Sequence, residues 1–490
     1  MIWILVFIIL AVTLAAALVS LVAPRPVVAE LANLTAAVTD LVLILWLFAI
    51  VPSRGVVGID SLLLIDPFGV WVLVCLGLVY LLATVYARGY LRGQGRSPRS
   101  LRIFYSLFAC FALVMILSSI QNNPGLYWVG IDLTTLISAI LVGLEPHRRA
   151  VEAAWKYLVI VAVGLSLALI GTVLFYFAGT FVRGASYPMT WESFARIAPR
   201  ADPALLLVAF LLVLIGYGTK AGLAPMHTWL PDAHSEGPTP VSAMLSGGLL
   251  NCAMLGIVRY LGILRHTSMG GDASRSLVVL GVASLVVAAL FITRQRGVKR
   301  LAAYSSVEHI GIIALGFGFG GVLGTVGALY QMVNHSLTKS AVFFGAGNAI
   351  EAYGTRQIAG IRRIGDRFPV MGAAWLAAAF AAVGAPPFGL FLSEFTIARG
   401  GIASANPWAV GVMGVALIVI FVGFMTHFRK MFFSSPRPHA SGADALRVTL
   451  PITSVAPMVV AVLVVLVLGV WWPHPLWVYF THIASTLGGH

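Results

Sequence analysis

Apolar runs of about 20 residues recur along the whole chain, and this feature limits the possible folds more than any other. As a helix, a run of that length crosses the roughly 30 Å hydrocarbon core of a bilayer. Of the 490 residues, 60% are hydrophobic and 10% are charged, whereas about a quarter are charged in soluble domains. Inside lipid, a helix satisfies its own backbone hydrogen bonds. The sequence therefore predicts an all-α integral membrane protein.

The apolar runs predict about fourteen transmembrane helices. The predicted spans are residues 2–22, 31–51, 61–86, 101–119, 124–143, 153–179, 203–223, 239–262, 276–293, 301–319, 322–349, 369–399, 407–431 and 449–472. The first run lacks a basic start and a small-residue cleavage site. We therefore interpret it as a retained helix and not as a signal peptide.

Basic residues collect in alternate loops, which is typical of the cytoplasmic side of a membrane protein. The clusters are Arg88, Arg92, Arg96, Arg99 and Arg102; Arg148 and Arg149; Arg294, Arg296, Lys299 and Arg300; Arg356, Arg362, Arg363 and Arg367; and Arg429, Lys430, Arg437 and Arg447. The net charge of +14 is thus explained by topology in a lipid bilayer, and no nucleic-acid partner is expected. Fourteen spans place both termini outside, in a multi-pass protein of a bacterial or archaeal-type inner (cytoplasmic) membrane.

Two of the five lysines, Lys220 and Lys339, lie inside apolar runs. A charged side chain at mid-bilayer depth costs several kcal/mol and usually serves transport or proton relay. Burial disfavours the charged form of lysine and a nearby carboxylate restores it, so such a pair can hold and then release a proton. The alternative is an ion pair that only packs helices together.

Two predicted spans are interrupted by glycine and proline. Lys220 is followed by Ala-Gly-Leu-Ala-Pro, ending at Pro225, and Gly384-Ala-Pro-Pro-Phe-Gly389 precedes Glu394. Discontinuous helices 7 and 12, five spans apart, predict two inverted five-helix repeats with the transport site at the breaks. The predicted domains are an N-terminal three-helix segment (1–100), half-channel repeats of helices 4–8 (101–262) and helices 9–13 (276–431), and helix 14 with a tail (449–490).

Four motifs in these spans resemble one family. They are the run from Lys220 to His234 with the following Glu-Gly-Pro-Thr-Pro, Lys299-Arg-Leu-Ala-Ala-Tyr-Ser-Ser306, the run from Asn334 to Asn348, and Ser393-Glu394-Phe395. Together they resemble the antiporter-like proton-conducting subunits of respiratory complex I, cation/proton antiporters and membrane-bound hydrogenases. The run from Ser306 to Gly311, together with Asn251, is most similar to the component F branch of hydrogenase-4.

The resemblance implies a buried proton relay. Lys220 matches the central lysine of the first half-channel, and Asp132 on span five matches its carboxylate partner, shorter by one methylene. His335 and Lys339 match the pair on span eleven, and their spacing of four puts both on one helix face. Glu394 matches the terminal residue on the broken span twelve, where the proton would leave.

Five further positions are candidates for relay or proton uptake. Asn251 replaces a lysine of many family members, and its amide can hydrogen-bond water but cannot carry a proton. The relay on that side would need water or His309, which titrates near neutral pH. His227, Asp232 and His234 lie in a proline-containing loop after span seven, where they form either a proton uptake site or a structural turn.

The predicted function is that of a proton-translocating subunit of a membrane-bound, redox-driven complex. The three cysteines lack metal-ligand spacing, so we expect no metal, cofactor or redox centre in this chain. Hydrogenase-like and Fe–S partner subunits are expected to supply the energy. The alternatives are a Na⁺/H⁺ antiporter module, the membrane subunit of an inorganic-carbon uptake system, and a scaffold without transport. The sequence leaves the choice between H⁺ and Na⁺ open.

Overall fold

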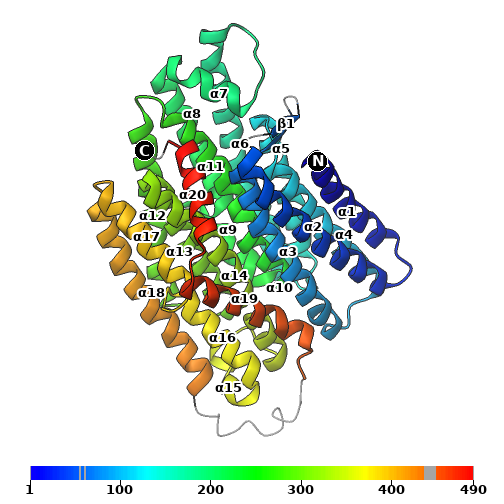
Figure 1. The fold of residues 1–490 in the computed structure, drawn as a ribbon. Helices are drawn as coiled ribbons and strands as arrows, with labels where there is room; N and C mark the ends of the chain where they lie inside the picture. Colours follow the sequence, from blue (N-terminus) through cyan, green and yellow to red (C-terminus); the bar gives the residue numbers. More distant parts are fainter. Residues whose placement is uncertain (1, 55–56, 60–61, 435–448, 489–490) are drawn as a thin grey trace.

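Helices make up nearly all of the described chain (Figure 1). The computed structural model describes residues 2–54, 57–59, 62–434 and 449–488. Arg437 and Arg447 of the last basic cluster lie outside these residues. Within the described part, the one sheet is the short antiparallel pair β1 (Val57–Ile59) and β2 (Leu63–Ile65). The predicted all-α membrane fold is confirmed.

The first six spans lie where the sequence predicts them, to within several residues at their ends. They are α1 (Ile2–Val22), α2 (Pro26–Arg54), α3 (Pro67–Gly93), α4 (Pro98–Ser119), α5 (Pro124–Gly143) and α6 (Arg148–Arg183). Helices α3, α4 and α5 begin with proline and are capped by Asp66, Ser97 and Asn123. Proline loses no helical hydrogen bond at that position, and the capping oxygen accepts from a free backbone N–H.

Spans 7 and 12 are discontinuous, as the sequence predicts. Span 7 consists of α8 (Pro203–Ala221), a 3₁₀ turn (Met226–Thr228) and α9 (Trp229–Glu236), and span 12 consists of α16 (Pro369–Ala382) and α17 (Gly389–Ala403). The prediction of a loop after residue 223 is wrong, because α9 continues the span beyond the break. Pro231 is compatible with α9 because it lies in the first turn, where backbone N–H groups have no helical partner.

Span 8 contains an interruption that the sequence did not predict. It runs through α10 (Thr239–Met244), a π-helical turn η3 (Leu245–Leu249) and α11 (Leu250–Leu264). The other long helices are α12 (Gly270–Ile292), α13 (Val298–Phe319), α14 (Gly321–Tyr353), α18 (Pro407–Phe433) and α19 (Ile452–Val470). Three short helices, α7 (Trp191–Ile197), α15 (Ile364–Arg367) and α20 (His474–Thr486), lie outside the predicted spans.

The predicted count of about fourteen spans agrees with these elements. Twelve helical segments of the described chain are long and apolar enough to cross a membrane. Helix α14 is 33 residues long but less apolar, because it carries polar residues such as His335 and Lys339. Helices α16 and α17 are each too short alone, but together they form the broken span 12.

Burial differs sharply between the centre and the edges of the bundle. The most apolar windows of α10–α11 and α13 are wholly buried, whereas those of α2 and α18 are one-third buried. Helices α1 and α2 lie at one edge of the view and α18 at the opposite edge (Figure 1). The start of α1 and the end of α20 lie toward the same end of the bundle, opposite α15 (Figure 1). Polar side chains inside the bundle are therefore concentrated where helices shield them from lipid.

Candidate functional site

Lys220 lies in the last turn of α8, directly before the break, and is fully buried. Gly222 ends the helix in the left-handed conformation at φ 80°, which favours glycine. The Lys220 Nζ donates to Thr135 Oγ1 on α5 and to the Tyr157 hydroxyl on α6, both at 2.7 Å. The Tyr157 hydroxyl lies 2.8 Å from Ser138 Oγ. The lysine thus stands at one end of a chain of hydroxyl groups.

Side chains satisfy the backbone groups that the break leaves free. Trp229 Nε1 donates to the Thr219 carbonyl at 2.7 Å, and the Ala224 N–H donates to Ser284 Oγ at 2.9 Å. The Trp229 ring also stacks on Tyr157 with 4.5 Å between ring centroids. The break therefore lies inside protein, the condition under which a membrane helix tolerates one.

Asp132 does not form the direct ion pair with Lys220 that the family resemblance implies. Among the described residues, no oxygen of Asp132 lies within 4.0 Å of the lysine nitrogen, and the aspartate is half-buried. The two groups still interact through their charges, since Asp132 is one helical turn from Thr135 on α5. The aspartate therefore acts on Lys220 at longer range, without direct contact.

The π-helical turn of span 8 is fastened by polar side chains of α14. Ser336 Oγ donates to the Gly247 carbonyl at 2.6 Å, and His335 Nε2 lies 3.1 Å from the Ser246 carbonyl. Asn251 Nδ2 donates to Ser336 Oγ at 2.9 Å and to the Gly247 carbonyl at 3.1 Å. A π-helical turn leaves carbonyls free for such contacts and is common at functional sites. Asn251 thus holds the turn in place.

Lys339 is fully buried on α14 and is linked to a carboxyl group through one hydroxyl. Its Nζ donates to Ser305 Oγ on α13, and Ser305 Oγ lies 3.1 Å from Glu308 Oε2. Glu308 is also fully buried. Besides Glu308, Glu394 interacts with the Lys339 charge. Lysine, serine and glutamate therefore form a compact group that can share a proton.

His309 and His335 lie side by side, with 5.3 Å between ring centroids. His309 Nε2 is 2.9 Å from the carbonyl of Ala382, the last residue of α16 before the second break. Each histidine also has a buried Nδ1 with no partner among the described residues. A neutral imidazole has one donor and one acceptor nitrogen, so both rings can accept and pass on a proton.

Glu394 lies at the second break, against the backbone of Gly384. Gly384 has φ +66°, and a Cβ added there would lie 2.9 Å from the Glu394 carboxyl carbon. Glu394 also lines a cavity of about 390 Å³ whose other walls, such as Phe395 and Met413, are almost entirely apolar. The carboxyl thus sits between the buried relay and a hollow at the side of α17 and α18.

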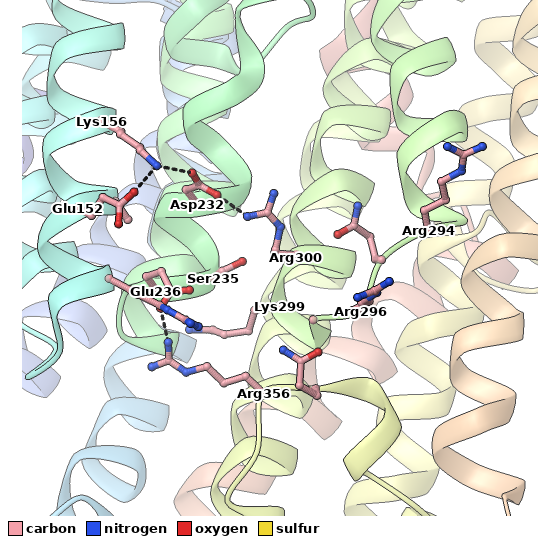
Figure 2. Close-up of a pocket in the computed structure, with 15 residues that line it drawn as sticks. Glu152, Lys156, Asp232, Ser235, Glu236, Arg294, Arg296, Lys299, Arg300 and Arg356 are labelled. Atoms are coloured by element: carbon pink, nitrogen blue, oxygen red, sulfur yellow. Dashed lines mark hydrogen bonds and ion pairs between the residues drawn. The ribbon is translucent and has the colours of Figure 1, made fainter.

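A second cavity, of about 650 Å³, opens among charged side chains where α6, α9 and α13 end or begin (Figure 2). Arginines from three predicted basic loops line it: Arg149, Arg294, Arg296, Arg300 and Arg356. We call the end of the bundle around this cavity the basic face. The sequence clusters are thus brought together in space, and seven basic and three acidic side chains line the cavity.

Asp232 and Glu236 of α9 form ion pairs with arginine side chains at the rim of this cavity (Figure 2). Arg300 donates to Asp232, and Arg356 donates to Glu236. Arg356 also contacts His147 Nε2 at 2.7 Å, and burial and this guanidinium lower the pKa of His147 below its ordinary value of 6.5. Asp232 is therefore a member of an ion-pair network and a weak candidate for proton uptake.

His234 lies deeper than the rim and is fully buried. Its ring stacks on Phe343 with 4.9 Å between centroids, and neither ring nitrogen has a partner among the described residues. It interacts with the charges of Lys299, His335 and Lys339, and so lies between the basic face and the relay. His227 is set apart, with its ring beside Tyr304 at 6.0 Å.

Metal binding has no support in the described residues, where no three His, Cys, Asp or Glu side chains come together as a metal site requires. Cys75, Cys110 and Cys252 are free.

Residues 122–421 match the family described as NADH:quinone oxidoreductase/Mrp antiporter, TM. The chain belongs to this family. It is 38% identical over 392 residues to a hydrogenase-4 component F homolog of Methylacidiphilum infernorum, covering 80% of each chain. It is 31% identical over 424 residues to NADH-quinone oxidoreductase subunit N of Desulforudis audaxviator, covering 83% of this chain and 81% of the relative. The family predicted from the four motifs is confirmed.

Solved structures share the fold of this family member across nearly its whole length. The archaeal membrane-bound sulfane sulfur reductase structure matches with a TM-score of 0.86 at 22% identity, covering 98% of this chain and 97% of the other. The Mrp complex of Dietzia sp. DQ12-45-1b matches with a TM-score of 0.86 at 20% identity, covering 99% and 97%. At these identities the matches show that the chain shares its fold with one chain of each complex.

Several site residues were not predicted from the sequence. Glu308 carries the same signal as the lysines, an ionisable side chain inside an apolar run, but no motif match singled it out. Thr135, Tyr157 and Ser305 carry no signal of their own, because hydroxyl residues are common in membrane helices. Only their contacts with the two lysines single them out.

Proposed function

We propose that this antiporter-like subunit carries protons along a buried path that includes Lys220, Lys339 and Glu394. The observation that carries the proposal is the bonding of the two lysines. Each Nζ binds hydroxyl groups, and no carboxylate oxygen lies within 4.0 Å of either among the described residues. A carboxylate in direct contact favours the charged form of lysine, whereas a buried lysine bound to hydroxyls releases its proton more readily when the nearby charge changes.

Proton uptake is proposed at the basic face. Lys299 lines the 650 Å³ cavity with its nitrogen 2.6 Å from the Gly237 carbonyl, and its charge acts on His234. His234 in turn acts on His335 and Lys339. This order leads from the cavity (Figure 2) to the central relay through the buried side chains of His234, His335 and Lys339.

The central relay is proposed to run from Lys339 through Ser305 and Glu308, with His309 and His335 beside it. Glu394, at the break in span 12, would receive the proton and release it. Asn251 has a positioning role in the first half, where it holds the π-helical turn. Asp132 adjusts the charge balance at Lys220 without direct contact. The two predicted half-channel repeats, 101–262 and 276–431, then each contribute one fully buried lysine to the path, Lys220 and Lys339.

The membrane setting and partners are also proposals. The basic face would be cytoplasmic, with both termini on the other side of a prokaryotic cytoplasmic membrane. The similarity to a hydrogenase-4 component F homolog supports hydrogenase-like and Fe–S partner subunits, whose electron transfer would change the charge near the first lysine. Moving a proton against the membrane potential requires about 2.3 kcal/mol per 100 mV, which such partners would supply.

The test is acidification of inverted membrane vesicles that hold the whole complex, in sodium-free buffer. Vesicles are energised with hydrogen, formate or NADH, whichever wild-type vesicles oxidise. Lys220→Ala and Lys339→Ala should abolish acidification at matched complex levels. Lys430→Ala, at an exposed position near the end of α18, is the matched control and should acidify normally.

Full acidification by both buried-lysine variants would refute the proposal and favour a structural role. If wild-type vesicles acidify only when sodium is supplied, the Na⁺/H⁺ antiporter alternative replaces it. Assembly of each variant is checked by the amount of complex recovered, since loss of a buried group also affects packing.

A further inference from the structure

Asp40 is a fully buried carboxyl group in the middle of α2, far from both half-channels in sequence. Its Oδ2 lies 2.6 Å from Thr13 Oγ1 in the middle of α1. Its Oδ1 is buried and has no hydrogen-bond partner among the described residues. Within the same residues, no lysine, arginine or histidine nitrogen lies within 4.0 Å of it. The sequence signal that marks the lysines, an ionisable residue inside an apolar run, also marks Asp40.

The single hydrogen of the Thr13 hydroxyl indicates which protonation state of Asp40 fits this geometry. Thr13 Oγ1 lies 2.8 Å from the Ile9 carbonyl as well as 2.6 Å from Asp40. The hydroxyl has one hydrogen, and a carbonyl oxygen can only accept. If Thr13 donates to Ile9, the second contact is a hydrogen bond only when Asp40 carries a proton and donates it to Thr13. A neutral acid therefore satisfies both contacts, and a carboxylate satisfies one.

Polar side chains on one stripe of α2 connect Asp40 toward the basic face. Glu30, Asn33, Ala37 and Asp40 share this stripe and are all buried, and Glu30 is bound by Arg88 and Arg92. Over ten residues the helix rises about 15 Å. Beyond Asp40, the same stripe continues with Ile44, Leu47 and Val51, which are fully buried and apolar. The stripe is thus polar on the basic-face half and apolar on the other.

Neighbouring helices complete the polar side of this stripe. Asn33 Nδ2 donates to Ser20 Oγ on α1 at 2.9 Å, and the Tyr80 hydroxyl on α3 donates to Asn33 Oδ1 at 3.4 Å. Tyr80 also lies within electrostatic range of Asp40, and of Cys110 on α4. Between Asn33 and Asp40 the packing of α1, α2 and α4 is built from alanines such as Ala16 and Ala36. Small side chains there let the three helices approach one another closely.

We infer that Asp40 is an additional proton-binding site, loaded from the basic face through Glu30, Asn33 and Tyr80. This inference rests on the proposed proton transport but adds a group in the N-terminal three-helix segment, outside both half-channels. Glu30 is the charged group at the mouth, Tyr80 on α3 lies within electrostatic range of Asp40, and Cys110 on α4 packs beside the alanine cluster. The polar side chains that α1 bonds to this stripe are Thr13 and Ser20, which do not titrate.

The experiment compares wild type with Asp40→Asn in the vesicle assay and in infrared difference spectra of the purified complex at rest and during turnover. Asparagine has nearly the same shape and can still bond Thr13, so packing is kept while proton binding is lost. Glu192→Gln, at an exposed site on α7, is the control for removing a carboxylate. Lys339→Ala, measured in the same vesicle assay, tests whether the proposed central relay carries protons.

Asp40→Asn should lower acidification several-fold at unchanged electron transfer and remove a carbonyl-stretching band of a protonated carboxyl from the difference spectrum. Normal acidification and an unchanged spectrum in Asp40→Asn, with Lys339→Ala inactive, would overturn this inference alone. Normal acidification in both variants would overturn the proposed function with it. Loss of acidification with no carboxyl band removed would also count against the inference, because it would indicate a structural defect.

Discussion

Gly384→Ala tests whether the position of the Glu394 carboxyl, and not only its charge, matters for proton transfer. An added Cβ would overlap Glu394 Oε2 and would lie 2.9 Å from the carboxyl carbon, whereas carbon atoms in contact prefer about 3.5–4.0 Å. The carboxyl must therefore move by at least about 1 Å. A misplacement of that size costs up to about 100-fold where reacting groups must be in contact. We expect proton pumping to fall by one to two orders of magnitude.

The same change also strains the backbone, and this effect needs its own control. Gly384 has φ +66°, and a left-handed alanine costs roughly 1–2 kcal/mol. Gly354 at the end of α14 has φ +61°, and a Cβ added there would meet no atom within 4 Å. Gly354→Ala should therefore show similar backbone strain without any displacement of a carboxyl.

The assay is acidification of inverted vesicles at matched complex levels, combined with thermal unfolding of the purified complex. Both variants should lose a comparable amount of stability, and only Gly384→Ala should lose pumping. Normal pumping by Gly384→Ala would refute the argument. So would an equal loss in Gly354→Ala, since strain alone would then explain the effect.

Two further predictions concern hydroxyl bonding and pH. Tyr157→Phe removes a buried hydrogen bond from Lys220, so it should reduce proton pumping and lower the free energy of unfolding by about 1–3 kcal/mol. Tyr260→Phe is the control. It removes a buried hydrogen bond that involves no lysine, so it should reduce stability only. The pKa of His147 is lowered below 6.5 by burial and by Arg356, so the folded state binds this proton less readily than the unfolded chain. The contribution of His147 to stability is therefore full above about pH 6.5 and declines as the pH falls below that value. The melting temperature should fall more between about pH 7.5 and 5.5 for wild type than for His147→Gln.

Much of the fold could be predicted because the formation of each membrane-spanning helix depends mainly on the residues of that span. A run of about 20 apolar residues must form a helix in lipid whatever its neighbours are, since no water can satisfy its backbone. Proline and glycine likewise break a helix through their own backbone chemistry, so the interruptions after Lys220 and Gly384 were visible in the sequence. The π-helical turn before Asn251 could not be predicted from the sequence, because side chains of α14 satisfy the carbonyls that the turn leaves free.

Part of the candidate site could likewise be predicted from the sequence, and part could not. By itself the sequence determined which ionisable residues lie at membrane depth, because the cost of burying a charge makes each one conspicuous in an apolar run. The tertiary structure alone decided what those residues contact. Thr135 and Tyr157 reach Lys220 from 85 and 63 positions away, and Thr13 meets Asp40 across 27. Such pairings depend on how helices pack, and a hydroxyl group gives no sign in the sequence of the helix that it will face.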